Sequence, residues 1–301
     1  MFNDGTVQTW GKCASPKLIS GKKALGVAST GTAFAVLFDD WTVQCWGDPS
    51  AGGALPDNFP VGKKVTALSS TDFAFTALFD DGTIFSCGDP NAGGVIPKDF
   101  PVGKKVVRLA STASAFVALF DDATIYCWGD RNTGGTTPTL PVGTKVNSIA
   151  STQSAFAAIL EDQNDVQTIF AWGDPDNGGT TPVMPSGNPV LAHIFATDHV
   201  FAAQLSDDSS STHNTLLCWG DGHYGGAAPK LPVGHIGQFT ATSRAFAVVM
   251  GDNKTVVAWG DKASGGSMPN LWNDQVVWIG ASGSLSESLC FGQNLKQTKH
   301  D

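Results

Sequence analysis

The chain has 301 residues and a formal net charge of −9, and it is rich in glycine (35) and proline (16). The negative charge disfavours nucleic acid as a partner, because phosphates are bound by dense Lys and Arg surfaces. No apolar run reaches the ~18 residues of a membrane span, so we expect no membrane insertion, and the first residues do not resemble a secretion signal. The many turn residues and the lack of helix-period runs predict an all-β protein.

A tryptophan-glycine step recurs along the whole chain. Cys87-Gly88 takes the place of one missing Trp, and successive steps lie roughly 36 to 47 residues apart, a period typical of propellers and other repeat proteins. Each Trp is large enough to fill the gap between two sheets, which predicts a structural, inter-sheet role. The tryptophans are Trp10, Trp46, Trp128, Trp172, Trp219 and Trp259.

The elements of one repeat are clearest in the fourth unit. A second strand that is apolar on both faces is expected to be covered on both sides. A Ser/Thr turn precedes it, an acidic hairpin follows it, and after the third strand a Gly-rich loop and a crossing segment lead to a Gly-Lys corner. In chain order, the expected elements are strand 106–110, turn 111–114, strand 115–120, hairpin 121–122, strand 124–128, loop 129–135, crossing segment 138–142 and corner 143–145.

The two ends of the chain complement each other. Residues 1–12 begin in the middle of a unit, and residues 276–291 supply the complementary strands, with Leu289–Phe291 matching Met1-Phe2. We therefore expect one domain over residues 1–301, a seven-bladed β-propeller whose first blade is shared by both ends. Closing the ring in this way removes the sheet edges. Residues 292–301 are expected to form a C-terminal tail.

Six cysteines do not indicate a disulfide framework. Cys45, Cys127 and Cys218 precede the Trp of three units, and equivalent positions of different blades lie further apart than the ~4.4–6.8 Å between Cα atoms that a disulfide requires. We interpret them as small buried hydrophobic residues with reduced thiols. Cys13 and Cys290 are the exception, because both fall in the closing blade. Unpaired cysteines and the missing leader favour an intracellular location.

The repeat resembles a known group of propellers. Strand, turn, strand, Trp-Gly-Asp, then a Gly-containing loop and Thr-Thr-Pro (136–138 and 180–182) are similar to the short-repeat propellers of the regulator of chromosome condensation superfamily. Within it, the pattern is most similar to the propeller-type β-lactamase inhibitory proteins, which also have seven units of about this length. The resemblance implies a seven-bladed fold. It implies no single function, since this superfamily includes exchange factors, inhibitors, photoreceptors and scaffolds.

The sixth unit departs most from the repeat. Its Ser/Thr turn reads Thr197-Asp198-His199-Val200 and its loop reads Asp221-Gly222-His223-Tyr224. Strand direction puts both at the same end of one blade, next to the equivalent loops of the seventh unit. We predict a contact patch for a protein partner here, because Tyr and Arg are frequent in binding hot spots. The patch consists of His199, His223, Tyr224, Arg244 and Lys262.

The same loops contain the best candidates for a metal site. Asp198, His199 and His223 have side chains that bind zinc and other transition metals. A further ligand at a fixed spacing is missing, so exposed loop histidines are the simpler interpretation, and we expect no metal and no cofactor. The repeated Asp after each Trp-Gly is interpreted as an Asx-type turn residue rather than a calcium ligand.

The opposite face carries three other departures. Trp41 stands at a tight turn where the next unit has Gly82, and Trp272 stands at a corner of the adjacent blade. Such residues are rarely needed for packing, so we predict a second docking surface at Trp41 and Trp272. The hairpins at 163–166 and 209–214 are lengthened on this face.

The Lys corners of the first half (Lys22-Lys23 onward) are expected to offset the neighbouring acidic turns.

No catalytic constellation is found in the sequence. A nucleophile elbow, a Gly-rich phosphate loop and a Cys/His pair at a usable spacing are all missing. We therefore expect a non-catalytic protein-binding or scaffold propeller, not an enzyme, with another protein as its partner. The alternative is a small-ligand or glycan binder using the Ser/Thr/Asp/Asn-rich loops around the central channel, although this face offers only Tyr224 as a stacking aromatic residue.

Overall fold

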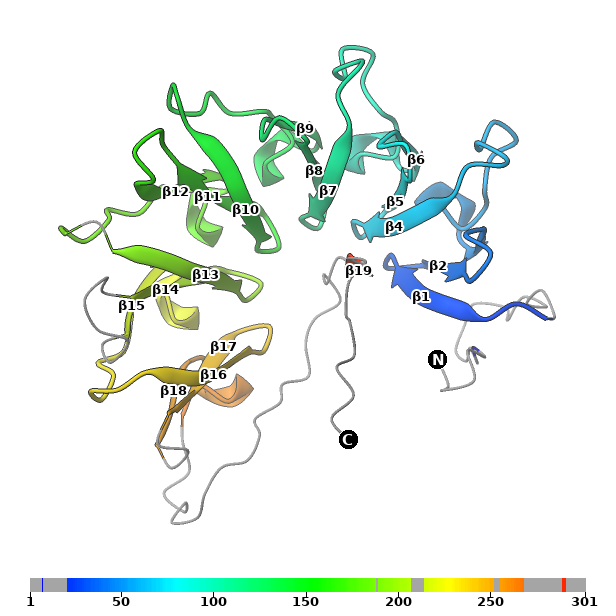
Figure 1. Cartoon of the computed structure of the whole chain (residues 1–301). Helices are drawn as coiled ribbons and strands as arrows, with labels where there is room; N and C mark the ends of the chain where they lie inside the picture. Colours follow the sequence, from blue (N-terminus) through cyan, green and yellow to red (C-terminus); the bar gives the residue numbers. More distant parts are fainter. Residues whose placement is uncertain are drawn as a thin grey trace, which may run out of the picture.

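The computed structural model describes residues 7, 21–187, 189–206, 214–251, 255–267 and 289–290. These residues form six antiparallel sheets, each built from three consecutive strands (Figure 1). The first to sixth sheets correspond to the second to seventh units of the sequence. In chain order they comprise β1 (Ala24–Ser29), β2 (Ala33–Phe38) and β3 (Val43–Gly47); β4 (Val65–Ser70), β5 (Ala74–Phe79) and β6 (Ile84–Gly88); β7 (Val106–Ser111), β8 (Ala115–Phe120) and β9 (Ile125–Gly129); β10 (Lys145–Ser151), β11 (Ala155–Glu161) and β12 (Gln167–Gly173); β13 (Val190–Ala196), β14 (Val200–Ser206) and β15 (Asn214–Gly220); β16 (Ile236–Ala241), β17 (Ala245–Met250) and β18 (Val256–Gly260).

A short 3-10 turn follows the third strand of every sheet. None of the helical turns among the described residues is long or apolar enough to cross a membrane. The turns are η1 (Pro49–Ala51), η2 (Pro90–Ala92), η3 (Arg131–Thr133), η4 (Pro175–Asn177), η5 (Gly222–Tyr224) and η6 (Lys262–Ser264).

The sheets follow one another in chain order around a central axis, with the first strand of each sheet innermost (Figure 1). Each first strand pairs with the second in a register that shifts near its start, as between Val106 and Arg108 in β7. Such a β-bulge increases local twist, which suits blades that fan out from an axis. The all-β propeller architecture expected from the repeat is confirmed at this level.

The core lies between neighbouring sheets. All six residues of β8 are buried, as expected for a strand covered on both faces. Trp128 stacks on Phe116 of its own sheet at 5.3 Å between ring centroids. Its Nε1 donates a hydrogen bond to the carbonyl oxygen of Gly93, which follows η2 of the preceding sheet, at 3.0 Å. Trp172 and Trp219 make the same bond to Gly134 and Gly178. The inter-sheet role of these tryptophans is thus confirmed, while Trp10 lies outside the described residues.

The turns between first and second strands are linked into an arc. In each turn, a backbone N–H donates to a carbonyl oxygen in the equivalent turn of the next sheet, at 2.8–2.9 Å. These bonds join the six sheets at one end of the strands and fix the spacing of the loops there. They run from Gly31 to Asp72, Asp72 to Ala113, Ala113 to Gln153, Gln153 to Asp198, and Asp198 to Ser243.

The predicted closing blade falls almost wholly on residues that the structure does not describe. Val7 is described, and it packs against the core of the first sheet, near Phe38 and Trp46. Near the other end, β19 (Leu289–Cys290) pairs antiparallel with β4, at Leu68 and Ala67. The closing blade shared by residues 1–12 and 276–291 therefore stays a prediction.

Candidate functional site

Three of the five predicted patch residues meet where the fifth sheet adjoins the sixth. His199 lies in the turn before β14, Tyr224 ends η5, and Arg244 lies in the turn before β17. The rings of His199 and Tyr224 stack, with centroids 4.7 Å apart and planes at 27°. The guanidinium carbon of Arg244 lies 5.3 Å from the Tyr224 ring centroid, a cation–π contact. We call these three residues the His-Tyr-Arg cluster.

Local turn chemistry holds the cluster in place. Thr197 Oγ1 accepts hydrogen bonds from the backbone N–H groups of His199 and Val200, which fixes the turn that carries the imidazole. Asp221 caps η5 by accepting from the N–H of His223 at 2.8 Å. Gly220 allows the two loops to approach each other, since a Cβ atom at this position would lie 2.4 Å from the His199 carbonyl oxygen. The cluster therefore rests on two backbone turns rather than on flexible side-chain contacts.

The cluster is partly buried at its two rings and exposed to solvent at its guanidinium group. His199 and Tyr224 are half-buried, and Arg244 is exposed. His199 Nδ1 contacts Asn177 Oδ1 of the preceding sheet's turn η4. An aromatic ring and a guanidinium group held in this way expose both apolar and charged surface at little entropic cost. This is the character of a protein-binding hot spot.

The other two patch residues lie on exposed turns beside the cluster. His223 Nδ1 is 3.0 Å from Asp221 Oδ1, and its side chain is 93% exposed. Lys262 begins η6 and is exposed. Hydrogen-bond donors lower the pKa of both capping carboxylates. For Asp221 the largest cause is the backbone N–H of His223. For Asp261 the largest cause is the hydroxyl of Ser264, and the charge of Arg244 contributes less. Both carboxylates are therefore ionised beside the basic groups.

The metal candidates do not assemble into a site. His199 is bonded to Asn177 and His223 to Asp221, while the backbone of Asp198 joins the arc of turn-to-turn bonds. Within the described part of the chain, no three His, Cys, Asp or Glu side chains come together in a way that could hold a metal ion.

On the opposite face, Trp41 is half-buried at the β2–β3 turn, with φ of 66°. Its carbonyl oxygen accepts a bond from Val65 N, which ties this turn to the second sheet. Asp162 folds the lengthened hairpin by accepting from Asn164 N and Val166 N. Trp272 lies outside the described residues, as does most of the 209–214 hairpin, so the second predicted docking surface is described only at Trp41.

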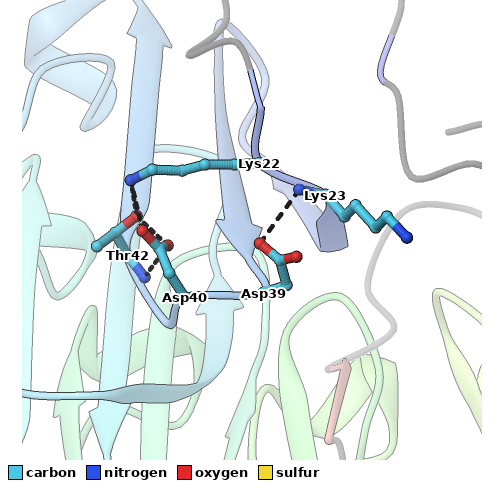
Figure 2. A network of polar contacts seen from close by, with 5 residues as sticks. All are labelled: Lys22, Lys23, Asp39, Asp40 and Thr42. Carbon is cyan, nitrogen blue, oxygen red and sulfur yellow. Dashed lines mark hydrogen bonds and ion pairs between the residues drawn. The ribbon is translucent and has the colours of Figure 1, made fainter.

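The Lys corners form a repeated clamp (Figure 2). Lys22 Nζ lies 2.7 Å from Asp40 Oδ2, donates to Thr42 Oγ1 at 2.8 Å, and sits 5.7 Å from the Phe38 ring centroid. Lys23 N donates to Asp39 in the same picture. Lys63 and Lys104 repeat the Lys22 pattern in the next two sheets with Asp81 and Asp122. The expectation that Lys corners offset acidic turns is confirmed for these three.

The repeated Asp after each Trp-Gly caps the 3-10 turn that follows it. In every described sheet its side chain accepts a hydrogen bond from the backbone N–H two residues later, which confirms the Asx-type interpretation. The six residues are Asp48, Asp89, Asp130, Asp174, Asp221 and Asp261.

One surface feature was missed at the sequence level. Five crossing segments each present a valine whose side chain is almost fully exposed. The Pro-Val-Gly triplet at residues 60–62, 101–103, 141–143 and 232–234 was the available signal. Single exposed apolar residues are common on proteins, and these lie one per repeat rather than in one continuous patch. They are Val61 (96%), Val102 (98%), Val142 (102%), Val183 (89%) and Val233 (84%).

No family model and no curated protein matches the chain. Solved structures do match. The CRINKLY WD40 ectodomain of the receptor kinase ACR4 from Arabidopsis thaliana is 19% identical, with a TM-score of 0.50 over 80% of this chain and 80% of that one. Prp20p from Saccharomyces cerevisiae, described with its binding properties to Gsp1p and histones, is 18% identical, with a TM-score of 0.50 over 79% of this chain and 72% of that one.

A second yeast structure, RCC1 (Prp20) bound to Kap60, is 18% identical, with a TM-score of 0.52 over 79% of this chain and 70% of that one. At such identities the likeness shows the fold alone, which is that of an RCC1-like β-propeller. The finer resemblance to β-lactamase inhibitory proteins has no support among these structures.

Proposed function

We propose that this chain is a non-catalytic, protein-binding propeller that docks its partner through the rim of the fifth and sixth sheets. The observation that carries the proposal is the His-Tyr-Arg cluster, in which Tyr224 contacts a ring from one turn and a guanidinium from another. Most other described turns on this face carry small polar residues, although the equivalent turn of the second sheet carries the exposed Phe73. Exposed Lys262 and His223 extend it along the same rim.

Structural neighbours support a binding role. Yeast Prp20 has been crystallised with Kap60, and its described partners include Gsp1p and histones. Those partners belong to that protein, and what carries over is that a propeller of this kind can dock proteins. The described thiols support a non-catalytic role, because burial raises the pKa of Cys45, Cys127 and Cys218 to about 12, far above that of a nucleophilic cysteine.

The decisive experiment is affinity capture from the native source with three forms of the chain. The test variant is Tyr224→Ala/Arg244→Ala. The matched control is Thr133→Ala/Ser114→Ala, which truncates the equivalent loop positions of the third sheet on the same face. We expect a partner that wild type and control retain and the test variant loses.

Two other results would redirect the assignment. A partner retained by the test variant but lost on Trp41→Gly would move docking to the opposite face. Capture of no protein, together with glycan binding that Tyr224→Ala abolishes, would support the glycan-binding alternative, since sugars stack on aromatic rings.

We further propose that the ring has seven blades and is closed by residues 1–12 and 276–288. The support is the contact of Val7 with the core of the first sheet. Deleting residues 1–12 should lower the midpoint of thermal unfolding, because it would open an edge of the ring. An unchanged midpoint would contradict the proposed closure.

A further inference from the structure

The repeat sets a sulfur against an aromatic ring between neighbouring sheets. Cys127 of β9 lies against the indole of Trp172 in the next sheet, in one shared core cluster. Cys218 of β15 lies in the same way against Trp259 of the sheet after it. In both cases a cysteine on the third strand of one sheet packs against the Trp of the following sheet.

In the first two sheets this arrangement contains two sulfurs. Cys45 of β3 occupies the position of Cys127 and Cys218, while the position of the following Trp is taken by Cys87 of β6. Cys87 pairs with Phe75 across the strands, as Trp128 pairs with Phe116. Both cysteines pack into the core cluster between the first and second sheets. The residue that faces Cys45 is therefore a second thiol in place of an indole.

Turn η1, which follows β3, lies close to β6. Gly52 follows η1, seven residues after Cys45, and a Cβ atom at Gly52 would lie 3.2 Å from the Cys87 carbonyl oxygen. Both cysteines are free thiols in this structure. Each is half-buried, so neither is sealed from a small reagent.

We propose that Cys45 and Cys87 form an inter-sheet dithiol that is oxidised to a disulfide joining the first and second sheets. With the diazene oxidant diamide, one thiolate adds to the N=N bond and the second attacks the resulting S–N sulfur. The S–S bond forms as the S–N bond breaks, and the hydrazine that leaves carries the two electrons and two protons.

The surroundings set the pH dependence of this reaction. Burial raises the pKa of Cys45 to about 12, with a smaller contribution from Cys87, and burial raises that of Cys87 to about 11. Because the thiolate is the reacting form, oxidation is expected to accelerate as pH rises from neutral towards the range of these pKa values. The dithiol is accordingly stable against mild oxidants at neutral pH.

The test uses native wild-type protein treated with diamide at neutral and at alkaline pH, then denatured, alkylated and digested with trypsin. Cys45 and Cys87 fall in separate tryptic peptides, residues 24–63 and 65–98. We expect these two peptides to be recovered as one linked species that reduction separates, with more of it at alkaline pH. Cys127 and Cys218, which face indoles, should remain alkylatable.

The matched control is Cys87→Trp, which restores the repeat and leaves Cys45 facing an indole. This variant should give no linked peptide and should fold, as judged by circular dichroism. A second probe is phenylarsine oxide, which releases water on binding two adjacent thiols and should protect Cys45 and Cys87 together in wild type only. Independent alkylation of both residues after either treatment, or linkage of Cys45 to another cysteine, would overturn the proposal.

Discussion

At the residue scale, single buried side chains hold together two separate parts of the fold. Trp128 fills the space against the preceding sheet and donates its N–H to the Gly93 carbonyl group. Thr112 caps its own turn through Ala115 N and donates to the carbonyl oxygen of Thr133. Because each such residue satisfies buried backbone groups, its loss costs more than its apolar area alone.

Replacement of Trp128 by Ala is expected to destabilise the protein by ~3–5 kcal/mol, since it removes a fully buried indole. Trp128→Phe should cost less, about 1–3 kcal/mol, because it retains most of the volume but leaves the Gly93 carbonyl group without its donor. Urea unfolding of both variants gives these free energies. Equal losses for Ala and Phe would contradict this division between packing and hydrogen bonding.

The Lys clamps make a pH-dependent contribution to stability. Lys22, followed by Thr42, lowers the pKa of Asp40 to about 2, and Lys104 does the same for Asp122. An unfolded Asp has a pKa of about 3.9. A folded pKa below the unfolded one stabilises the fold above about pH 4, and this stabilisation is lost as pH falls towards 2.

The variant Asp40→Asn/Asp81→Asn/Asp122→Asn should therefore have a modestly lower Tm than wild type at pH 7, because the pairs are solvent-exposed and screened. The difference should shrink as pH falls below about 4 and be largely lost only below pH 2, where the folded carboxylates become protonated. Thermal unfolding followed by circular dichroism over this range measures it, with Asp57→Asn as the control. A difference that persists unchanged at pH 2 would rule out the clamp as its source.

At the element scale, the β-hairpins between second and third strands share one conformational requirement. Trp41, Gly82 and Ala123 occupy the same turn position, and all three have positive φ (66°, 81° and 63°). Glycine adopts this region freely, whereas other residues are strained there. Trp41 is thus held in a backbone conformation that favours glycine.

Ala123→Gly is expected to stabilise the protein by about 0.5–1 kcal/mol, because relief of left-handed strain exceeds the added entropy of the unfolded chain. The reverse change in the second sheet, Gly82→Ala, should destabilise by ~1–2 kcal/mol or more. Its new Cβ atom would also lie 2.6 Å from Lys105 Cβ. Chemical denaturation of the two variants should give opposite signs; the same sign for both would contradict the argument.

The elements themselves could be predicted closely from the sequence. Strands expected at 106–110, 115–120 and 124–128 are observed at Val106–Ser111, Ala115–Phe120 and Ile125–Gly129. Apolar runs bounded by Asp, Gly and Ser carry that information locally. The contacts of the site could not be predicted in the same way. The repeat places the Lys corners near acidic turns and puts His199 and Tyr224 at the same end of one blade, but the stacking of the two rings and the atoms of each ion pair depend on how separate loops converge in space.

At the scale of the whole molecule, the arc of turn-to-turn hydrogen bonds gathers residues of distant sheets around one axis. Asp72 belongs to the turn of the second sheet and Asp198 to the equivalent turn of the fifth. Burial, and then the charge of Asp198, raises the pKa of Asp72 above its ordinary value. A charge on the fifth sheet is therefore expected to act on the second sheet across the ring.

This coupling predicts a stabilising substitution. A carboxyl group whose pKa is raised by folding costs no stability at low pH, where both states are protonated, and lowers stability as pH rises through its folded pKa. Asp72→Asn should therefore raise the Tm at pH 7 and leave it unchanged at about pH 3, below the ordinary pKa of Asp. Added salt should reduce the gain, because it screens the repulsion from Asp198.

A double-mutant cycle separates that repulsion from the effect of burial. If the two charges repel across the ring, the gain from Asp72→Asn must be smaller in an Asp198→Asn background than in wild type, even if Asp198→Asn alone alters the turn hydrogen bonds. Thermal unfolding of the four proteins at pH 7, in low and high salt, measures this difference. Strictly additive effects at low salt would show that burial alone raises the pKa of Asp72, and that the ring transmits no charge interaction between the second and fifth sheets.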